Sequence, residues 1–285
     1  PTCLHPTALA TTAITRSSVD FSWTASTSTP ANGYQWEVRT SGDPGSGATG
    51  LAASGTTAAG ITNAQATGLT ANTNYFIYVL SDCGSGDLSS WTSATSFTTP
   101  CVAVDIPYYE DFSSVTVPAI PNCMSIQTVS GNPWTTNATV LAGMTAPAAR
   151  ISYTNSGSPV MDSWLYTAGL NLTAGVSYQL IYKYGNNSTF YSESMSVAYG
   201  TGNTEADMIT PLLDHPSIND NTLHIDTVNF TPATSGVFYI GFKCYSIANQ
   251  YYLYVDDISV TLTPSCYSPV ASAWIAPDCA NSQYL

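Results

Sequence analysis

Apolar and polar residues alternate along most of this chain, and the alternation predicts β-strands rather than helices. Val19, Phe21 and Trp23 alternate with polar residues, and the same pattern recurs at 34–38. A period of two places successive side chains on opposite faces of a sheet, so one face of each strand is expected to be buried. In residues 1–100 such strands recur about every 8–12 residues with Gly, Asn and Ser turns between them, which is typical of a β-sandwich.

Residues 101–263 show the same strand pattern over a longer stretch. The clearest segments are 177–184, 195–199 and 236–244. A run of strands of this total length predicts a larger jelly-roll β-sandwich. The one stretch that fits a helical turn is 205–213, bounded by Pro211 and Pro216.

A short Pro-x-Cys phrase recurs where we expect domains to join. Residues 1–6 (PTCLHP) are echoed by residues 264–269 (PSCYSP), and Thr99-Pro100-Cys101 lies between them. Proline suits such joints because it cannot continue a β-ladder. We therefore expect domains at 1–100 and 101–263, with 264–285 as a linker or the truncated start of a further domain. The alternative is coincidence in a Thr- and Pro-rich chain.

Composition narrows the function classes. Hydrophobic residues make up 44% and charged residues only 8%, with a formal net charge of −13 and five basic residues. Nucleic acid and anionic membranes are poor partners for such a chain, because both attract clustered Lys and Arg. No apolar run approaches the roughly 18 residues of a membrane span. The acidic excess indicates bound divalent cations, a surface kept soluble by self-repulsion, or both.

The seven cysteines are dispersed, without a C-x-x-C pair. Zinc sites need closer spacing, so the pattern favours disulfides formed in an oxidising, extracellular compartment. Because seven is odd, at least one cysteine is expected to be free or to pair outside this segment. The chain also starts without Met or a signal peptide, so we expect it to be a processed part of something longer.

Residues 3–99 resemble a fibronectin type III domain. The features that carry the resemblance are Trp23, the strand 33–38 (GYQWEV), and Leu69 six residues before Tyr75, which fits a tyrosine corner. Ala71 stands where that family usually has proline. The resemblance implies that these aromatic residues belong to the core.

The second unit resembles the cleaved-adhesin and MAM-like jelly rolls of bacterial proteins exported by the type IX secretion route. The resemblance lies in residues 106–112 (IPYYEDF), 161–165 (MDSWL) and 255–260 (VDDISV). It implies a calcium-bound fold of the adhesion or carbohydrate-binding type, but it does not indicate the ligand.

Two acidic pairs are candidate calcium ligands. Val255 and Ile258 fall out of phase along one strand, which requires a β-bulge at Asp256-Asp257. The opening strand supplies the other pair, Glu110-Asp111, and the first and last strands of a jelly roll are commonly neighbours. With so few basic residues, no salt-bridge partner is evident for these four acids, and Ca²⁺ accepts 6–8 oxygen ligands. We expect a structural Ca²⁺ site at Glu110, Asp111, Asp256 and Asp257; the alternative is solvated acids at strand ends.

The fibronectin type III topology implies a disulfide pairing. In that topology the first strand starts at the pole that carries the loop after Cys83, so Cys3–Cys83 is favoured over Cys83–Cys101. Cys101 is then expected to pair with Cys123. Cys244, on an apolar strand, is expected to be a buried free thiol. By analogy with Cys3, Cys266 is expected to pair with a cysteine of the truncated next domain, with Cys279 as the local alternative.

No arrangement of residues indicates catalysis. The chain has only three histidines, His5, His215 and His224, which we expect to lie far apart, and no nucleophile motif is present. We therefore expect no enzymatic activity.

Aromatic and hydroxyl residues offer further candidate sites. Tyr191 and the pair Tyr251-Tyr252 follow Asn-containing turns and are candidate glycan-binding residues, although packed sheet is the commoner role of tyrosine. Thr227, in an Asp-Thr-Val phrase, is a candidate O-glycosylation site.

These features lead to two hypotheses of different class. The first is a non-catalytic module of a secreted, repetitive cell-surface adhesin or filament, acting as a calcium-stabilised spacer that contacts neighbouring copies, glycans or proteins. The second is a glycan-binding, lectin-like accessory module of a secreted hydrolase. Tandem copies at a period of about 263 residues in the parent protein would favour the first.

Overall fold

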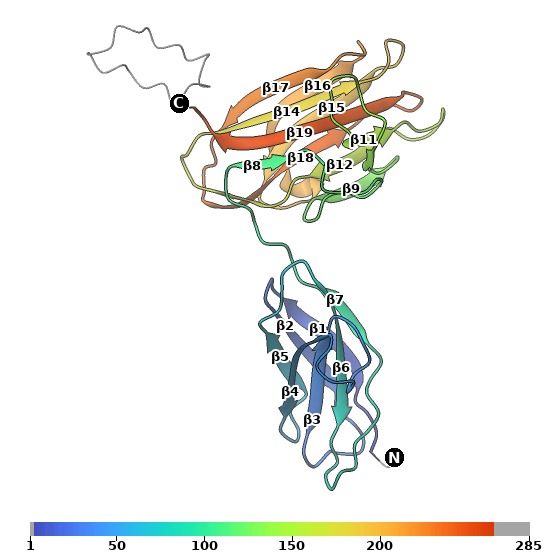
Figure 1. Ribbon diagram of the computed structural model, residues 1–285, viewed down its shortest axis with the longest axis vertical. Coiled ribbons are helices and arrows are strands. Elements are labelled where there is room, and N and C mark those ends of the chain that lie inside the picture. Colours follow the sequence, from blue (N-terminus) through green and yellow to red (C-terminus); the bar gives the residue numbers. More distant parts are fainter. Residues whose placement is uncertain (1–2, 265–285) are drawn as a thin grey trace, which may run out of the picture. The chain divides into compact units, whose positions relative to one another are not determined.

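The computed structural model describes residues 3–264 and divides into two compact units, and the boundary along the chain lies between Val102 and Ala103. Figure 1 shows the strands of both units. The sequence places this boundary two residues earlier. Cys266, Cys279 and the rest of the expected third segment, apart from Pro264, lie outside the described residues.

The first domain is a β-sandwich of two antiparallel sheets. One sheet has the order β1-β2-β5 and the other the order β4-β3-β6-β7. The strands are β1 (Thr7–Ile14), β2 (Ser18–Thr24), β3 (Tyr34–Arg39), β4 (Leu51–Thr57), β5 (Asn63–Thr67), β6 (Asn74–Ser81) and β7 (Thr95–Thr98). The alternation predicted from the sequence matches the burial of the side chains, because Val19, Phe21 and Trp23 of β2 point into the core. Trp36 of β3 packs edge-on against Phe21, with ring centroids 5.4 Å apart.

The second domain is a larger jelly-roll sandwich, also built from two antiparallel sheets. One sheet has the order β10-β11-β19-β14-β17, with β8 paired to β19; the other has the order β16-β15-β18-β12-β9, with β13 paired to β18. The strands are β8 (Tyr108–Glu110), β9 (Ser125–Ser130), β10 (Thr135–Asn137), β11 (Ala148–Ser152), β12 (Asp162–Tyr166), β13 (Leu170–Leu172), β14 (Tyr178–Asn186), β15 (Glu193–Gly200), β16 (Thr210–Ile218), β17 (His224–Phe230), β18 (Gly236–Cys244) and β19 (Tyr252–Leu262). The predicted all-β fold class, a fibronectin type III-like sandwich followed by a jelly roll, is confirmed.

A tyrosine corner is present in each domain. In the first, the backbone N–H of Thr70 donates a 2.8 Å hydrogen bond to the hydroxyl of Tyr75. In the second, Thr173 donates in the same way to Tyr178, again at 2.8 Å. Each corner fixes the entry of the chain into a central strand, β6 or β14.

The helical prediction for residues 205–213 is wrong over most of its length. Only Glu205–Asp207 form a single 3₁₀ turn, and Thr210–Ile218 form β16. β16 lies at the edge of its sheet and pairs only with β15, so Pro211 and Pro216 are tolerated where a central strand would exclude them. Among residues 3–264, no helix has the length and apolar character needed to cross a bilayer.

Candidate metal site, contact surface and disulfides

The closing strand β19 contains the bulge that the sequence phase slip requires. Ile181 pairs with Ser259 while Lys183 pairs with Asp256, so β19 has one residue more than β14 at this point. Val255 and Ile258 both reach the core as a result. Asp257, within the bulge, has φ 47°, a left-handed conformation that Asp tolerates better than most residues.

Asp256 is the acid that turns inward. It is fully buried, and its two oxygens accept hydrogen bonds from the backbone N–H groups of Asp257 (2.9 Å) and Thr145 (3.2 Å). Burial raises the pKa of Asp256 to about 6, mainly because a charged carboxylate loses its hydration there. No described Lys, Arg or His forms an ion pair with it.

Asp257 instead faces a cation. Lys183 of β14 forms an ion pair with it at 2.5 Å, and the hydroxyl of Tyr109 donates to its other oxygen at 2.6 Å. The sequence-based statement that these acids lack a basic partner is therefore wrong for Asp257. The pairing depends on the register of β14 against β19, which local sequence does not reveal.

Glu110 is the last residue of the opening strand β8, and Asp111 directly follows it. β8 pairs antiparallel with β19, and Glu110 lies opposite Ile258. Glu110 accepts a hydrogen bond from the backbone N–H of Phe112 at 2.7 Å, and burial raises its pKa. Asp111 is bound by the hydroxyl and N–H of Ser113, which lower its pKa.

Three of the four acids lie on the paired strands β8 and β19, and Asp111 directly follows β8; the four divide into two kinds. Asp257 and Asp111 are neutralised or hydrogen-bonded locally, whereas Asp256 and Glu110 are carboxylates that burial disfavours in their charged form. Within residues 3–264, no three His, Cys, Asp or Glu side chains gather closely enough to form a metal site by themselves. A cation here would need backbone carbonyl or water oxygens to complete its ligands.

The candidate glycan-binding tyrosines come together at one end of the second domain. Tyr251 stacks on Tyr191 with ring centroids 5.9 Å apart, and on Tyr153 at 5.8 Å. Tyr252 lies against Tyr251 at 4.3 Å, and the guanidinium of Arg150 lies 4.3 Å above the ring of Tyr252. We call Tyr153, Tyr191, Tyr251 and Tyr252 the tyrosine cluster; the sequence reading missed Tyr153 because it lies almost 100 residues from Tyr251.

Buried polar groups hold the loops of the tyrosine cluster in place. Glu193 is only 2% exposed, and it accepts hydrogen bonds from the N–H of Tyr251 at 2.6 Å and from the hydroxyl of Ser246. The side-chain amide of the fully buried Asn186 donates to the carbonyl of Tyr191 at 2.8 Å. Beside the cluster, Phe190 is 92% exposed.

The histidines are not as separated as the sequence implies. His215 and His224 both contact the ring of Tyr184, with centroid distances of 4.3 and 5.1 Å. Nε2 of His215 lies 2.8 Å from the hydroxyl of Tyr182 and 3.2 Å from a carboxylate oxygen of Asp226. The expectation that the histidines are far apart is therefore wrong for this pair, because β16 and β17 both lie beside Tyr184.

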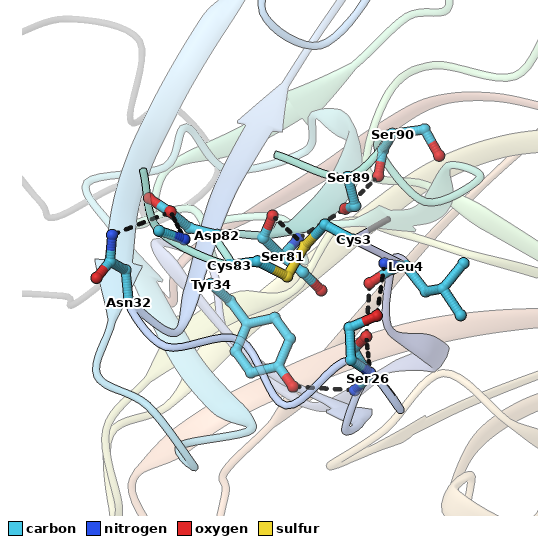
Figure 2. The surroundings of a disulfide bond; sticks show 12 residues. Cys3, Leu4, Ser26, Asn32, Tyr34, Ser81, Asp82, Cys83, Ser89 and Ser90 are labelled. Carbon is cyan, nitrogen blue, oxygen red and sulfur yellow. Dashed lines mark hydrogen bonds between the residues drawn. A yellow bond between two sulfur atoms is a disulfide. The ribbon is translucent and has the colours of Figure 1, made fainter. Parts of the chain in front are cut away.

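A disulfide bond joins Cys3 to Cys83 in the first domain. Cys3 and Cys83 are bonded with an S–S distance of 2.02 Å and Cα atoms 5.9 Å apart. Figure 2 shows that the N-terminal segment and the end of β6 meet here, with Ser26 donating to the carbonyl of Leu4 at 2.6 Å. This is the pairing that the fibronectin type III topology favours.

The remaining described cysteines fall into two groups. Cys101 and Cys123 are both disulfide-bonded. Cys244 is free and buried, as the sequence predicts, and burial raises the pKa of its thiol to about 12, so it is unreactive at neutral pH. Thr227, the candidate glycosylation site, is exposed on β17.

Comparison with known proteins identifies the first domain. Residues 4–98 match the family model of the Fibronectin type III domain, so this domain is of that type. No curated protein matches the chain.

Solved structures resemble the chain weakly. One is the K1 cleaved adhesin domain of Lys-gingipain from Porphyromonas gingivalis W83, at 19% identity and TM-score 0.46, covering 55% of this chain and 99% of that one. Another is the K3 cleaved adhesin domain of the same protein, at 20% identity and TM-score 0.43, covering 54% and 96%. A third is the CBM22-1 xylan-binding domain from Paenibacillus barcinonensis Xyn10C, at 6% identity and TM-score 0.40, covering 58% and 99%.

Proposed function

We propose that this chain is a non-catalytic adhesion module of a secreted bacterial surface protein, acting as a spacer and a contact surface. The observation that carries the proposal is the tyrosine cluster. The ring of Tyr251 stacks on those of Tyr191 and Tyr153 and lies tilted against that of Tyr252, and together with the exposed Phe190 these rings form an aromatic surface. Exposed aromatic patches of this kind serve as interaction sites, because large rigid side chains bury much area at a small entropic cost.

The buried acids of the second domain support a structural rather than a catalytic role. Asp256 and Glu193 each accept hydrogen bonds from backbone N–H groups of loops that pack over them. General acid–base catalysis instead needs carboxyl groups within reach of a substrate. The acids of this chain therefore fit the role of loop anchors.

The secreted, repetitive setting is part of the same proposal. The Cys3–Cys83 disulfide is of the kind that persists in oxidising, extracellular compartments. The resemblance of residues 106–112 and 255–260 to cleaved-adhesin phrases favours type IX export, and the recurring Pro-x-Cys phrase favours tandem copies as neighbours.

A structural Ca²⁺ ion between β8 and β19 is the second part of the proposal. Asp256 is fully buried and forms no ion pair with any residue of 3–264, and burial disfavours the charged form of Glu110, on the strand paired with β19, in the same way. A divalent cation would offset both carboxylates, with Asp111 and Asp257 as further oxygen donors. Asp257 would then share its charge between the ion and Lys183.

A glycan-binding accessory module is the second candidate function, and the tyrosine cluster favours it specifically. Sugar rings stack on aromatic faces, and neighbouring amide or guanidinium groups bond their hydroxyls. Arg150 and Gln250 lie beside these rings: Arg150 covers Tyr252, and Gln250 accepts a hydrogen bond from Ser192 next to Tyr191.

One adhesion experiment separates the two candidates. Beads coated with the chain, or with its Tyr251→Ala or Phe190→Ala variant, are passed in flow over native mucin and over enzymatically deglycosylated mucin. Ile209→Ala is the matched control, since Ile209 is 78% exposed and lies outside the cluster.

We expect retention that both cluster variants reduce and the control does not. Retention on both surfaces supports the adhesin, whereas retention on native mucin alone supports the glycan-binding module. Absence of retention on both, or retention that the cluster variants leave unchanged, contradicts the tyrosine cluster as a contact surface.

A further inference from the structure

A shallow groove of about 210 Å³ lies on the first domain, remote in sequence from the tyrosine cluster and independent of the function proposed for it. It is lined by Gln35 and Glu37 of β3, Ser54 and Thr56 of β4, and Trp91. Its volume is below the roughly 300–1,000 Å³ of pockets for drug-sized ligands, so it has room for a small group such as one sugar ring.

The period of two in β3 explains why polar side chains line this groove. Tyr34, Trp36 and Val38 occupy the core, which leaves Gln35 and Glu37 on the opposite face of the sheet. Across the strand pair, Gln35 lies opposite Thr56 and Glu37 lies opposite Ser54. An amide, a carboxylate and two hydroxyl groups therefore form a polar floor.

The fully buried side chain of Arg39 fixes the carboxylate of Glu37. Nη1 of Arg39 lies 2.6 Å from Oε2 of Glu37, and the N–H of Gly45 donates to the same oxygen at 3.0 Å. Arg39 therefore offsets the charge of Glu37, while the other oxygen, Oε1, accepts no hydrogen bond from the described residues. A neutral donor rather than a cation suits that oxygen.

Arg39 also orders the Gly-rich loop at the end of the groove. Its Nη2 donates to the carbonyls of Gly47 and Thr49 at 2.9 and 2.7 Å. Gly45 of this loop packs near the indole of Trp91: a Cβ atom added to Gly45 would lie only 3.4 Å from the indole nitrogen. The groove is thus held in shape, before any ligand binds, by the ion pair between the buried Arg39 and the partly exposed Glu37.

Trp91 forms the aromatic wall. The backbone next to it is fixed to β6, because the N–H of Thr92 donates to the carbonyl of Val79 at 2.9 Å and its hydroxyl accepts from the Val79 N–H at 3.1 Å. Trp91 itself is only partly buried. A partly exposed indole beside amide, hydroxyl and carboxylate groups presents one apolar face and several hydrogen-bonding groups.

We propose that this groove binds a single pyranose residue of a neutral saccharide, stacked on Trp91 and bonded by Gln35 and Glu37. The offset charge of Glu37 favours a neutral polyhydroxylated ligand over a cationic side chain, which would compete with Arg39 for the same carboxylate.

The test is a titration of the ¹⁵N-labelled full chain, followed by the indole N–H signal of Trp91, which the Trp91→Phe variant assigns. The probes are methyl β-D-glucopyranoside, methyl β-D-galactopyranoside, methyl α-D-mannopyranoside and N-acetylglucosamine, together with Nα-acetyl-lysine methylamide as the cationic alternative. We expect a saturable shift with at least one sugar and none with the lysine derivative.

Two glutamines provide a matched pair of variants. Gln35, which lines the groove, donates to Asp82, and Gln65, on β5 of the other sheet, donates to Asp20 of β2. Gln35→Ala should weaken sugar binding roughly two- to tenfold, the equivalent of one hydrogen bond, and Gln65→Ala should leave it unchanged. The proposal is overturned if no sugar shifts the Trp91 signal, if the lysine derivative alone does, or if both variants weaken binding equally.

Discussion

Glu193 Oε1 lies 2.6 Å from the backbone nitrogen of Tyr251, and this contact joins the start of β15 to the loop that carries the tyrosine cluster. The other carboxylate oxygen accepts from the hydroxyl of Ser246. Because Glu193 is almost fully buried, its loss would remove the acceptor of the Tyr251 N–H and the acceptor of the Ser246 O–H, although the Ser246 oxygen would still accept from the N–H of Ser194.

Glu193→Ala should therefore destabilise the second domain by about 2–4 kcal/mol, and Glu193→Gln by less, because an amide oxygen can still accept from Tyr251. Burial raises the pKa of Glu193, so ionisation costs stability as the pH rises through the folded-state pKa, and the Gln variant escapes that cost. Urea denaturation followed by fluorescence measures both variants. Equal losses for Ala and Gln would show that the Tyr251 contact contributes little.

Removing Ca²⁺ should lower the thermal transition of the second domain and leave the first unchanged. An ion present at 100 times its dissociation constant stabilises by about 2.7 kcal/mol. Calorimetry with Ca²⁺ and with EGTA measures the shift. Asp256→Asn should abolish the response. Asp214→Asn should retain it, since Asp214 lies on β16 and accepts a hydrogen bond from Tyr245. Two transitions that EGTA does not move would rule out the ion.

The architecture was open to prediction because it follows from local alternation. Core positions in β2 and β3 repeat every second residue. The change of phase in the apolar pattern at Asp256-Asp257 predicts the β-bulge that the register of β14 against β19 contains. The second tyrosine corner was equally available: Leu172 precedes Tyr178 by six residues, the spacing of Leu69 and Tyr75.

The details of the sites depend on strand register and could not be predicted. Lys183 meets Asp257 only because β14 lies beside β19 with one extra residue in β19. Tyr153 joins the tyrosine cluster through the pairing of β11 with β19, which brings distant segments together. No spacing rule along one strand contains that information.

Loss of the Cys3–Cys83 disulfide should destabilise the first domain by about 4–5 kcal/mol, since it closes a loop with a sequence separation of 80. Cys3→Ser and Cys83→Ser should give the same loss, and the double variant no more than either. The thermal transition of the first domain measures it. Additive losses would show that the two sulfurs act separately.

Cys101 is predicted to pair with Cys123, and both are disulfide-bonded. Peptide mapping under non-reducing conditions should recover one linked peptide that contains both residues and a separate one that contains Cys3 and Cys83. A peptide linking Cys83 to Cys101 would contradict the pairing and the sandwich topology behind it.

His215 should make the second domain less stable in mild acid. Its imidazole lies against Tyr184 and Tyr182, with Asp226, Asp214 and His224 as the nearby charged groups. Burial lowers the pKa of His215, and this outweighs the opposing attraction of Asp226.

Since the folded-state pKa lies below the unfolded value of about 6.5, the unfolded chain binds the proton more readily, and stability falls as the pH drops through this window by at most about 1.4 kcal/mol per pH unit. His215→Gln stays neutral at every pH. From pH 7 to pH 5.5, the free energy of unfolding of the natural chain should therefore fall relative to that of this variant. Comparing the two chains at each pH cancels the contribution of the buried carboxyl groups, and His5→Gln in the first domain serves as the control. A difference that grows in the opposite direction would mean that the ion pair with Asp226 dominates and that His215 is protonated in the folded protein.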